Sequence, residues 1–432
     1  MNGDAVQAAP AMAGFDAFRR HNPKSDLFNV QRFHHVEFWT SDATNISKRF
    51  QHGLGMPLVA KSDQGTGNAL YASYVLRSNQ LVFAFTAPYS KKAATATPST
   101  PFQHYSTDAA YSFINSHGLA VRAVGVVVDD ARLAYEIAVK HGGKSVLEPL
   151  VLEEKADGGS LTVAEVALYG DVVLRFVSGS FTGPFMPMFQ NVDATGEETL
   201  GIQRLDHAVG NVHKLGEAAQ YLMGFTGFHE FAEFVTADVG TRDSGLNSTV
   251  FASNNEMVLL PVNEPTFGTP RKSQIQTYLE QNEGPGLQHL ALKSDDIFAT
   301  LRGMRARSSS GGFEFMPRPS DGYYERLPAR IGGVLTAQQF LDVKELGILV
   351  DRDDQGTLLQ IFSKPLGDRP TVFIEIIQRV GCRMVDVPQS AAAVQAELPV
   401  QQEQAGGCGG FGKGNFSELF KSIEDYERTL NV

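Results

Sequence analysis

The chain has little of what several protein classes require. Only two of its 432 residues are cysteines, Cys382 and Cys408, which excludes a disulfide framework or a multi-cysteine zinc site and indicates a reducing compartment. No run of about 18 apolar residues is present, so we expect no membrane span. Acidic residues outnumber basic ones by 48 to 37. The resulting net charge of −11 argues against a nucleic-acid partner, because phosphate contacts need clustered lysine and arginine.

Residues 1–26 show no targeting pattern. They contain no apolar stretch of signal-peptide length, and Asp4 comes early for a transit peptide. We therefore expect a cytoplasmic protein, with the plastid as the alternative. A hydrophobic content of 42% excludes a disordered chain, and the length predicts roughly three domains at ~150 residues each.

An internal repeat revises that domain count. Residues 32–56 and 204–228 each predict a strand followed by an amphipathic helix that ends at a glycine, with His35 falling on His207. A predicted hairpin follows each unit, over 71–88 and over 248–265.

A second strand–helix unit also recurs, at 121–143 and 287–312. Asp130 and Asp296 are the expected N-caps of its two helices. Further strands close these units, over 162–178, 347–364 and 369–380. The chain therefore consists of two halves, each built from two modules.

We place the boundary between the halves near residue 190, because 178–198 is rich in glycine, proline and polar residues. The N-terminal half, 1–190, is expected to be non-catalytic, and 191–432 is expected to carry the active site.

The C-terminal region predicts a loop and a helix. Residues 387–407 are expected to be a mobile loop, and 415–430 a helix with Asn415 and Glu418 forming a capping box. The apolar stripe of this helix consists of Phe416, Leu419, Phe420, Ile423 and Tyr426.

Three residues of the second half fit a metal site. His207, at the start of its strand, and His289 hold like places in the two modules, and Glu375 lies among apolar residues in the last strand. A buried carboxylate needs a metal or a cation beside it. Two imidazoles and one carboxylate leave three adjacent positions open on a non-haem Fe(II), enough for a bidentate substrate and dioxygen.

The first half lacks this combination, because Ala123 stands where His289 does and Arg175 falls opposite Glu375. Taken singly, a strand histidine is more often a hydrogen-bonded core or surface group than a ligand, and a lone strand carboxylate more often faces solvent. The agreement of three residues with the repeat favours a metal site in the second half. His213 lies beyond its strand and is expected in solvent.

The glycine-rich stretch 406–414 is not interpreted as a phosphate loop. Gly407 to Gly412 satisfies GxGxxG, but no strand is predicted before it, and Gly414 stands where a Walker A motif has serine or threonine. We interpret it as a hinge before the C-terminal helix, which would open and close over a cavity.

Several strings resemble the 4-hydroxyphenylpyruvate dioxygenase family, particularly its plant members. They are RLDHAVGNV (204–212), GPGLQHLAL (284–292), QIFSKP (360–365), RPTVFIEIIQR (369–379) and GGFGKGNFSELF (409–420), and the likeness runs from about residue 28 to the end. The implied fold is α+β of the vicinal-oxygen-chelate type, with two tandem open barrels of paired βαβββ modules and a C-terminal gating helix. The implied reaction oxidises 4-hydroxyphenylpyruvate with O2 to homogentisate and CO2. It is a step of tyrosine and phenylalanine breakdown and, in plants, of plastoquinone and tocopherol synthesis.

The resemblance also implies roles for individual residues. His207, His289 and Glu375 would hold Fe(II), and Gln288 and Gln360 would contact the substrate. The remaining implied residues form a polar network, an apolar ring pocket and a gate: Ser248, Asn263 and Gln274; Phe362 and Phe373; Phe411, Asn415 and Phe416. A homodimer without nucleic-acid or membrane partners is expected.

Three alternatives stay open. 4-Hydroxymandelate synthase uses the same substrate and metal but hydroxylates the benzylic carbon, whereas Phe362, Phe373 and Phe416 favour attack on the ring. A non-catalytic, ligand-sequestering protein of the same fold would need no iron. A glyoxalase-type metal isomerase would require a fourth protein ligand, which we do not find in the sequence.

Overall fold

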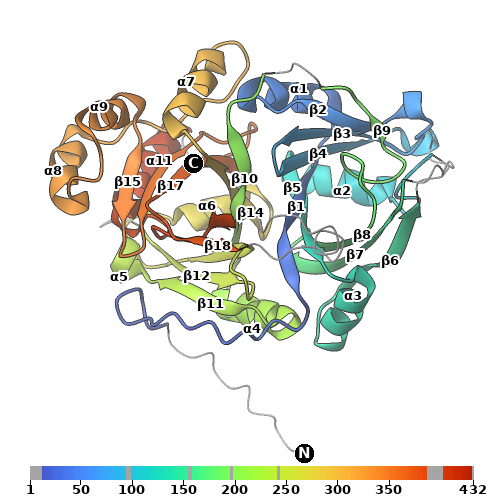
Figure 1. Ribbon diagram of the computed structural model, residues 1–432, viewed down its shortest axis with the longest axis horizontal. Coiled ribbons are helices and arrows are strands. Elements are labelled where there is room, and N and C mark those ends of the chain that lie inside the picture. The colour runs from blue at the N-terminus through green and yellow to red at the C-terminus, as the bar shows by residue number, and fades with distance from the viewer. Residues whose placement is uncertain are drawn as a thin grey trace, which may run out of the picture.

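The computed structural model describes residues 12–93, 99–153, 158–194, 198–240, 244–386 and 402–430. Two curled sheets lie side by side, the first in blue to green and the second in green through yellow to red (Figure 1). Within these ranges, none of the helices combines the length and apolar character that crossing a membrane requires.

The first sheet is built from the N-terminal part of the chain. Its elements, with their associated helices, are β1 (Val30–Trp39), α1 (Ala43–Leu54), β2 (Leu58–Ser62), η1 (Gln64–Thr66), β3 (Tyr71–Ser78), β4 (Leu81–Pro88), η2 (Lys91–Ala93), α2 (Thr107–His117), β5 (Ala120–Val128), α3 (Ala131–Lys140), β6 (Ser145–Glu153), β7 (Ser160–Tyr169), β8 (Val172–Gly179) and β9 (Gln190–Asn191). The strand order is β6-β7-β8-β5-β1-β4-β3-β2-β9.

The second sheet repeats this plan. Its elements are β10 (Ile202–Asn211), α4 (Leu215–Thr226), β11 (His229–Phe234), α5 (Thr236–Val239), β12 (Leu246–Ala252), β13 (Leu259–Pro265), α6 (Gln274–Gln281), β14 (Gly286–Ser294), α7 (Ile297–Ser308), α8 (Asp321–Ile331), α9 (Ala337–Leu346), β15 (Leu349–Arg352), β16 (Thr357–Phe362) and β17 (Phe373–Val380). The strand order is β11-β12-β13-β10-β14-β17-β16-β15. Read in the opposite direction, from β15 to β11, it matches the order of the first sheet strand for strand, apart from β9. After it come β18 (Met384–Asp386), β19 (Gln402–Gln404), η3 (Lys413–Asn415) and α11 (Phe416–Leu430).

The strand register confirms the residue equivalences that the repeat predicts. In the first sheet Gly125 of β5 lies between His35 of β1 and Arg175 of β8. In the second sheet Ala291 of β14 lies in the same way between His207 and Glu375. The four modules and the α+β vicinal-oxygen-chelate architecture are therefore as predicted. The division at residue 190 falls inside β9, which pairs with β2, and stays a prediction.

The module helices begin and end for local reasons. Asp130 and Asp296 cap α3 and α7 through backbone N–H groups of the first turn, as expected. Gly55 and Gly227 end α1 and α4 in the left-handed conformation, with φ of 59° and 77°. One continuous apolar core joins the two halves, and Phe50 of α1 meets Phe313 with 4.9 Å between ring centres.

Several local predictions need correction. His207 lies in the middle of β10 rather than at its start, and α8 and α9 fill a stretch for which no element was predicted. The short strand β19 does precede the glycine-rich stretch, although it pairs only with β18 and leads to no βαβ unit. Of the expected mobile loop, residues 387–401 lie outside the described ranges.

The two cysteines are paired. Cys382 and Cys408 form a disulfide with 5.9 Å between their Cα atoms. One bridge is not a disulfide framework, so the exclusion of such a framework is unaffected. A reducing compartment normally keeps cysteines as thiols, so the bridge does not follow from that expectation, and the compartment itself stays a prediction. The bridge ties the glycine-rich stretch before α11 to the residues that follow β17.

Candidate metal centre and its pocket

Two histidines and a carboxylate converge on the inner face of the second sheet. Oε2 of Glu375 lies 3.2 Å from His207 Nε2 and 3.4 Å from His289 Nε2, and the three ligand atoms lie within 4.8 Å of one another. Metal–ligand bonds of about 2.0–2.2 Å place two ligand atoms at right angles about 3 Å apart. The donor set and its spacing therefore fit a metal ion bound through one face.

The electrostatics of this group also favour a cation. Burial alone would raise the pKa of Glu375, but hydrogen bonds with His207 and His289 outweigh it and lower the pKa to about 2. Burial lowers the pKa of His289, which favours the neutral imidazole that a metal needs. A buried, ionised carboxylate beside two imidazoles is a site built for positive charge.

Each imidazole is oriented through its second nitrogen. Nδ1 of His207 lies 2.9 Å from Asp206 Oδ1, and Nδ1 of His289 lies 2.9 Å from Gln288 Oε1. Both oxygens can only accept, so each Nδ1 carries a proton. Each Nε2 faces Glu375, and once it is deprotonated it can offer its lone pair to a metal. A register shift between Leu205 and His207 allows the neighbouring side chains of Asp206 and His207 to meet.

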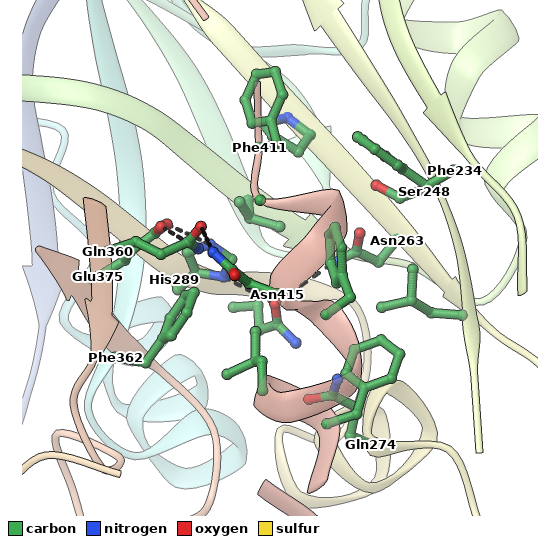
Figure 2. A pocket seen from close by; sticks show the side chains of 18 of the residues that line it. Phe234, Ser248, Asn263, Gln274, His289, Gln360, Phe362, Glu375, Phe411 and Asn415 are labelled. Carbon is green, nitrogen blue, oxygen red and sulfur yellow. Dashed lines mark hydrogen bonds and ion pairs between the residues drawn. The ribbon is translucent and has the colours of Figure 1, made fainter. Parts of the chain in front are cut away.

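Glu375 is linked to the C-terminal segment by a chain of amides. Gln360 donates from Nε2 to Glu375 Oε1 at 3.0 Å and accepts from Asn415 Nδ2 at 3.1 Å (Figure 2). Oδ1 of Asn415 accepts from Tyr323 at 2.9 Å and from Arg330 at 2.7 Å. Asn415 is therefore not the predicted helix cap, because two donors from α8 occupy the oxygen that capping would use.

A pocket extends from this metal group, and its empty space is about 620 Å³ when the part that is open to solvent is included. All of the predicted site residues line it: His207, Ser248, Asn263, Gln274, Gln288, His289, Gln360, Phe362, Phe373, Glu375, Phe411, Asn415 and Phe416. Phe373 stacks on the His289 ring at 4.9 Å and Phe411 meets the His207 ring edge-on at 5.2 Å, so aromatic rings wall the ligands. The helix α11 covers the pocket with Phe416, Leu419, Phe420 and Ile423.

The expected polar network is only partly present. Asn263 donates to Asn211 at 3.1 Å and to Gln288 at 3.4 Å, which fixes the Gln288 oxygen. Ser248 pairs with Asn263 across β12 and β13 and, like Gln274, lines the pocket (Figure 2). Within the described ranges neither side chain makes a hydrogen bond, so both are available to a ligand rather than joined to the network.

The first half holds a guanidinium where the second half has its carboxylate. Arg175 donates to His35 Nε2 at 2.9 Å and contacts Glu37 and Glu165 at 2.7 and 2.6 Å. Burial opposes this charge, but the two carboxylates outweigh it and raise the arginine pKa. The guanidinium of Arg175 balances the charge of both carboxylates and occupies the position that a metal ion would need beside His35. His213, also outside the site, is exposed as predicted.

Four residues that support the site were not predicted from the sequence. Asp206 and Arg379 stand behind His207, while Tyr323 and Arg330 hold Asn415. One signal was available: Asp206 directly precedes His207, and carboxylates commonly orient metal-binding imidazoles. The other three depend on contacts between distant segments, which no local pattern reveals.

Two open half-barrels of four βαβββ modules define a fold of the vicinal-oxygen-chelate type, and its second half carries one two-histidine, one-carboxylate group that could hold a metal ion. No protein-family model matches the chain, but comparison with individual known proteins identifies its family. It is 57% identical to 4-hydroxyphenylpyruvate dioxygenase from Daucus carota over 100% of this chain and 96% of that protein. It is 58% identical to the Arabidopsis thaliana enzyme of that name, over 99% and 96% respectively. The chain belongs to the 4-hydroxyphenylpyruvate dioxygenase family.

Solved structures support the fold alone. A triple mutant of 4-hydroxymandelate synthase from Streptomyces coelicolor matches with a TM-score of 0.69 at 22% identity, over 92% of this chain and 99% of that one. A fusion of a xylose isomerase-like TIM barrel with 4-hydroxyphenylpyruvate dioxygenase matches with a TM-score of 0.63 at 18% identity, and this chain spans about half of its length.

Proposed function

We propose that the chain oxidises 4-hydroxyphenylpyruvate with dioxygen to homogentisate and carbon dioxide, using Fe(II) held by His207, His289 and Glu375. The observation that carries the proposal is the convergence of these three ligand atoms in a covered aromatic pocket. A 2-oxo acid would chelate Fe(II) held there, and the ion would supply the activation of dioxygen. The family to which the chain belongs supports the choice of substrate.

Amide groups of the pocket are suited to bind the carboxylate end of the substrate. The oxygen of Gln288 accepts from His289 and Asn263, so its amino group is left to donate to an anion. The side-chain oxygen of Gln360 already accepts from Asn415, and one of its N–H groups donates to Glu375. We therefore assign Gln288 to direct substrate contact, and Gln360 to holding the carboxylate ligand in place.

The rest of the pocket would orient the aromatic ring and exclude water. Phe362 and Phe373 provide an apolar wall beside His289, and Ser248 and Gln274 offer uncommitted polar groups farther from the ligands. The α11 side chains close the opposite side, which keeps water from a reactive centre. Cytoplasmic residence and a homodimer stay predictions.

Product analysis tests this proposal. Protein reconstituted with Fe(II) and supplied with 4-hydroxyphenylpyruvate should consume oxygen and release homogentisate and CO2 in equal amounts. 4-Hydroxymandelate as the product would instead assign benzylic hydroxylation. Replacement of His207, His289 or Glu375 by alanine should abolish iron binding and oxygen uptake, whereas His213→Ala, at an exposed histidine, should change neither. Turnover retained in any of the three ligand variants would refute the site.

A further inference from the structure

Arg379 is a fully buried arginine that lies behind the metal group. Its side chain has 0% exposure, and Nε and Nη2 donate to the two oxygens of Asp206 at 3.0 and 2.7 Å. Asp206, 1% exposed, in turn accepts from Nδ1 of His207. Removing two charges from water costs several kcal/mol for each ion, so such a pair is weak as a purely stabilising device. Its position beside a metal ligand suggests a more specific role.

The repeat within the chain supplies an internal comparison. Gly179 stands at the place of Arg379, because it lies four residues after Arg175 and pairs with Leu161 in the equivalent register. His34 stands at the place of Asp206, and its Nδ1 contacts Nδ1 of His35 at 2.7 Å. The first half therefore has no counterpart of the Asp206–Arg379 pair at these two positions, and its buried arginine, Arg175, stands at the place of Glu375 instead.

Arg379 also reaches the segment that covers the site. Its Nη1 donates to the carbonyl oxygens of Cys408 and Gly410, the latter at 2.7 Å. The guanidinium carbon lies 5.7 Å from the ring centre of Phe411, and that ring meets His207 edge-on. One guanidinium therefore contacts both the partner of the imidazole and the segment packed over the same imidazole.

We propose that Arg379 is a positioning residue that acts through Asp206 on His207. It holds the Asp206 carboxylate so that the imidazole keeps its proton on Nδ1 and directs Nε2 at the metal. The inference rests on the proposed function only in taking His207 as a metal ligand. Loss of a carboxylate partner of a metal-bound histidine typically lowers metal affinity by about 10–100-fold.

Metal binding by the purified apoprotein tests the proposal, with Co²⁺ alone as the probe and a chromogenic chelator as competitor. Asp206→Asn should raise the Kd for Co²⁺ about 10–100-fold. The double variant Asp206→Asn with Arg379→Gln should show the same rise, and it leaves no unpaired buried charge that could prevent folding. Arg379→Lys should give a smaller rise, because one ammonium cannot hold both carboxylate oxygens in the same fork geometry.

The matched control is Glu165→Gln, which removes one carboxylate from the buried Arg175 in the half without ligands. It should lower the thermal stability and leave the Kd for Co²⁺ unchanged. Wild-type affinity in Arg379→Lys, or in both Asp206→Asn and the double variant, would overturn the proposal. Because Co²⁺ binding is read without turnover, a wild-type protein that forms no homogentisate would contradict the proposed function and not this inference.

Discussion

Replacement of Gly412 by alanine tests how tightly the covering segment is fitted to the metal group. Gly412 has φ of 78°, and a Cβ there would lie 2.0 Å from Oε1 of Gln360, the atom that accepts from Asn415. The left-handed backbone costs a non-glycine residue about 1–2 kcal/mol. Displacing Gln360 also disturbs its hydrogen bonds with Asn415 and Glu375, each of which contributes roughly 0.5–3 kcal/mol. We expect α11 to lose about 2–4 kcal/mol of protection against local opening.

Hydrogen exchange of the α11 amides measures this loss directly, because protection factors report the free energy of local opening. About 2–4 kcal/mol corresponds to roughly a 30- to 1000-fold faster exchange, and turnover should fall with it. Gly410→Ala is the matched control, since its φ is 75° but the nearest atom to its Cβ, Asp353 Oδ2, lies 3.7 Å away. Gly410→Ala should lose only the free energy of the left-handed backbone, so the α11 amides should exchange about 5- to 30-fold faster than in the wild type. Equal effects in the two variants would refute the reasoning.

Three further predictions concern the same segment. Burial raises the pKa of Glu427 to about 7. Between pH ~4.5 and 7 the folded state therefore binds more protons than the unfolded state. The free energy of unfolding should fall as the pH rises through that window. Glu427→Gln should remove up to ~3 kcal/mol of this pH dependence in thermal unfolding, and an unchanged profile would contradict it. Cys382→Ser removes a disulfide that spans 26 residues and should lower the free energy of unfolding by roughly 3 kcal/mol. Wild-type protein treated with dithiothreitol should show the same loss. Asn415→Ala should remove the hydrogen bonds of this side chain with Tyr323, Arg330 and Gln360, although the Val350 carbonyl still accepts from the first two. It should destabilise α11 by about 1–3 kcal/mol, and full protection of α11 in exchange would argue against that.

The internal repeat made the metal group predictable from the sequence. His207 and His289 recur at like places, and the register of Arg175 opposite Glu375 follows from the same spacing. The prediction of this group depends on periodicity and pairing, which sequence patterns report well. The other residues of the pocket were assigned from the resemblance to the family and not from the repeat.

The supporting shell was not predictable in the same way. Neighbouring side chains on a strand normally point to opposite faces, so only the irregular register at Asp206 brings it to His207. Asn415 was assigned to capping because its type and position favour a cap, but Tyr323 and Arg330, on a helix almost 90 residues earlier, take its oxygen. The pairing of Cys382 with Cys408 likewise depends on how β18 and β19 meet.

Arg175 gives the first half a cation that is covalently part of the chain. It binds His35 and two carboxylates at the place where the second half has Glu375. The charge balance of this cluster therefore does not depend on the supply of any ion. Because one continuous apolar core joins the two halves, the second half packs against a frame whose buried charges are fixed by the chain itself.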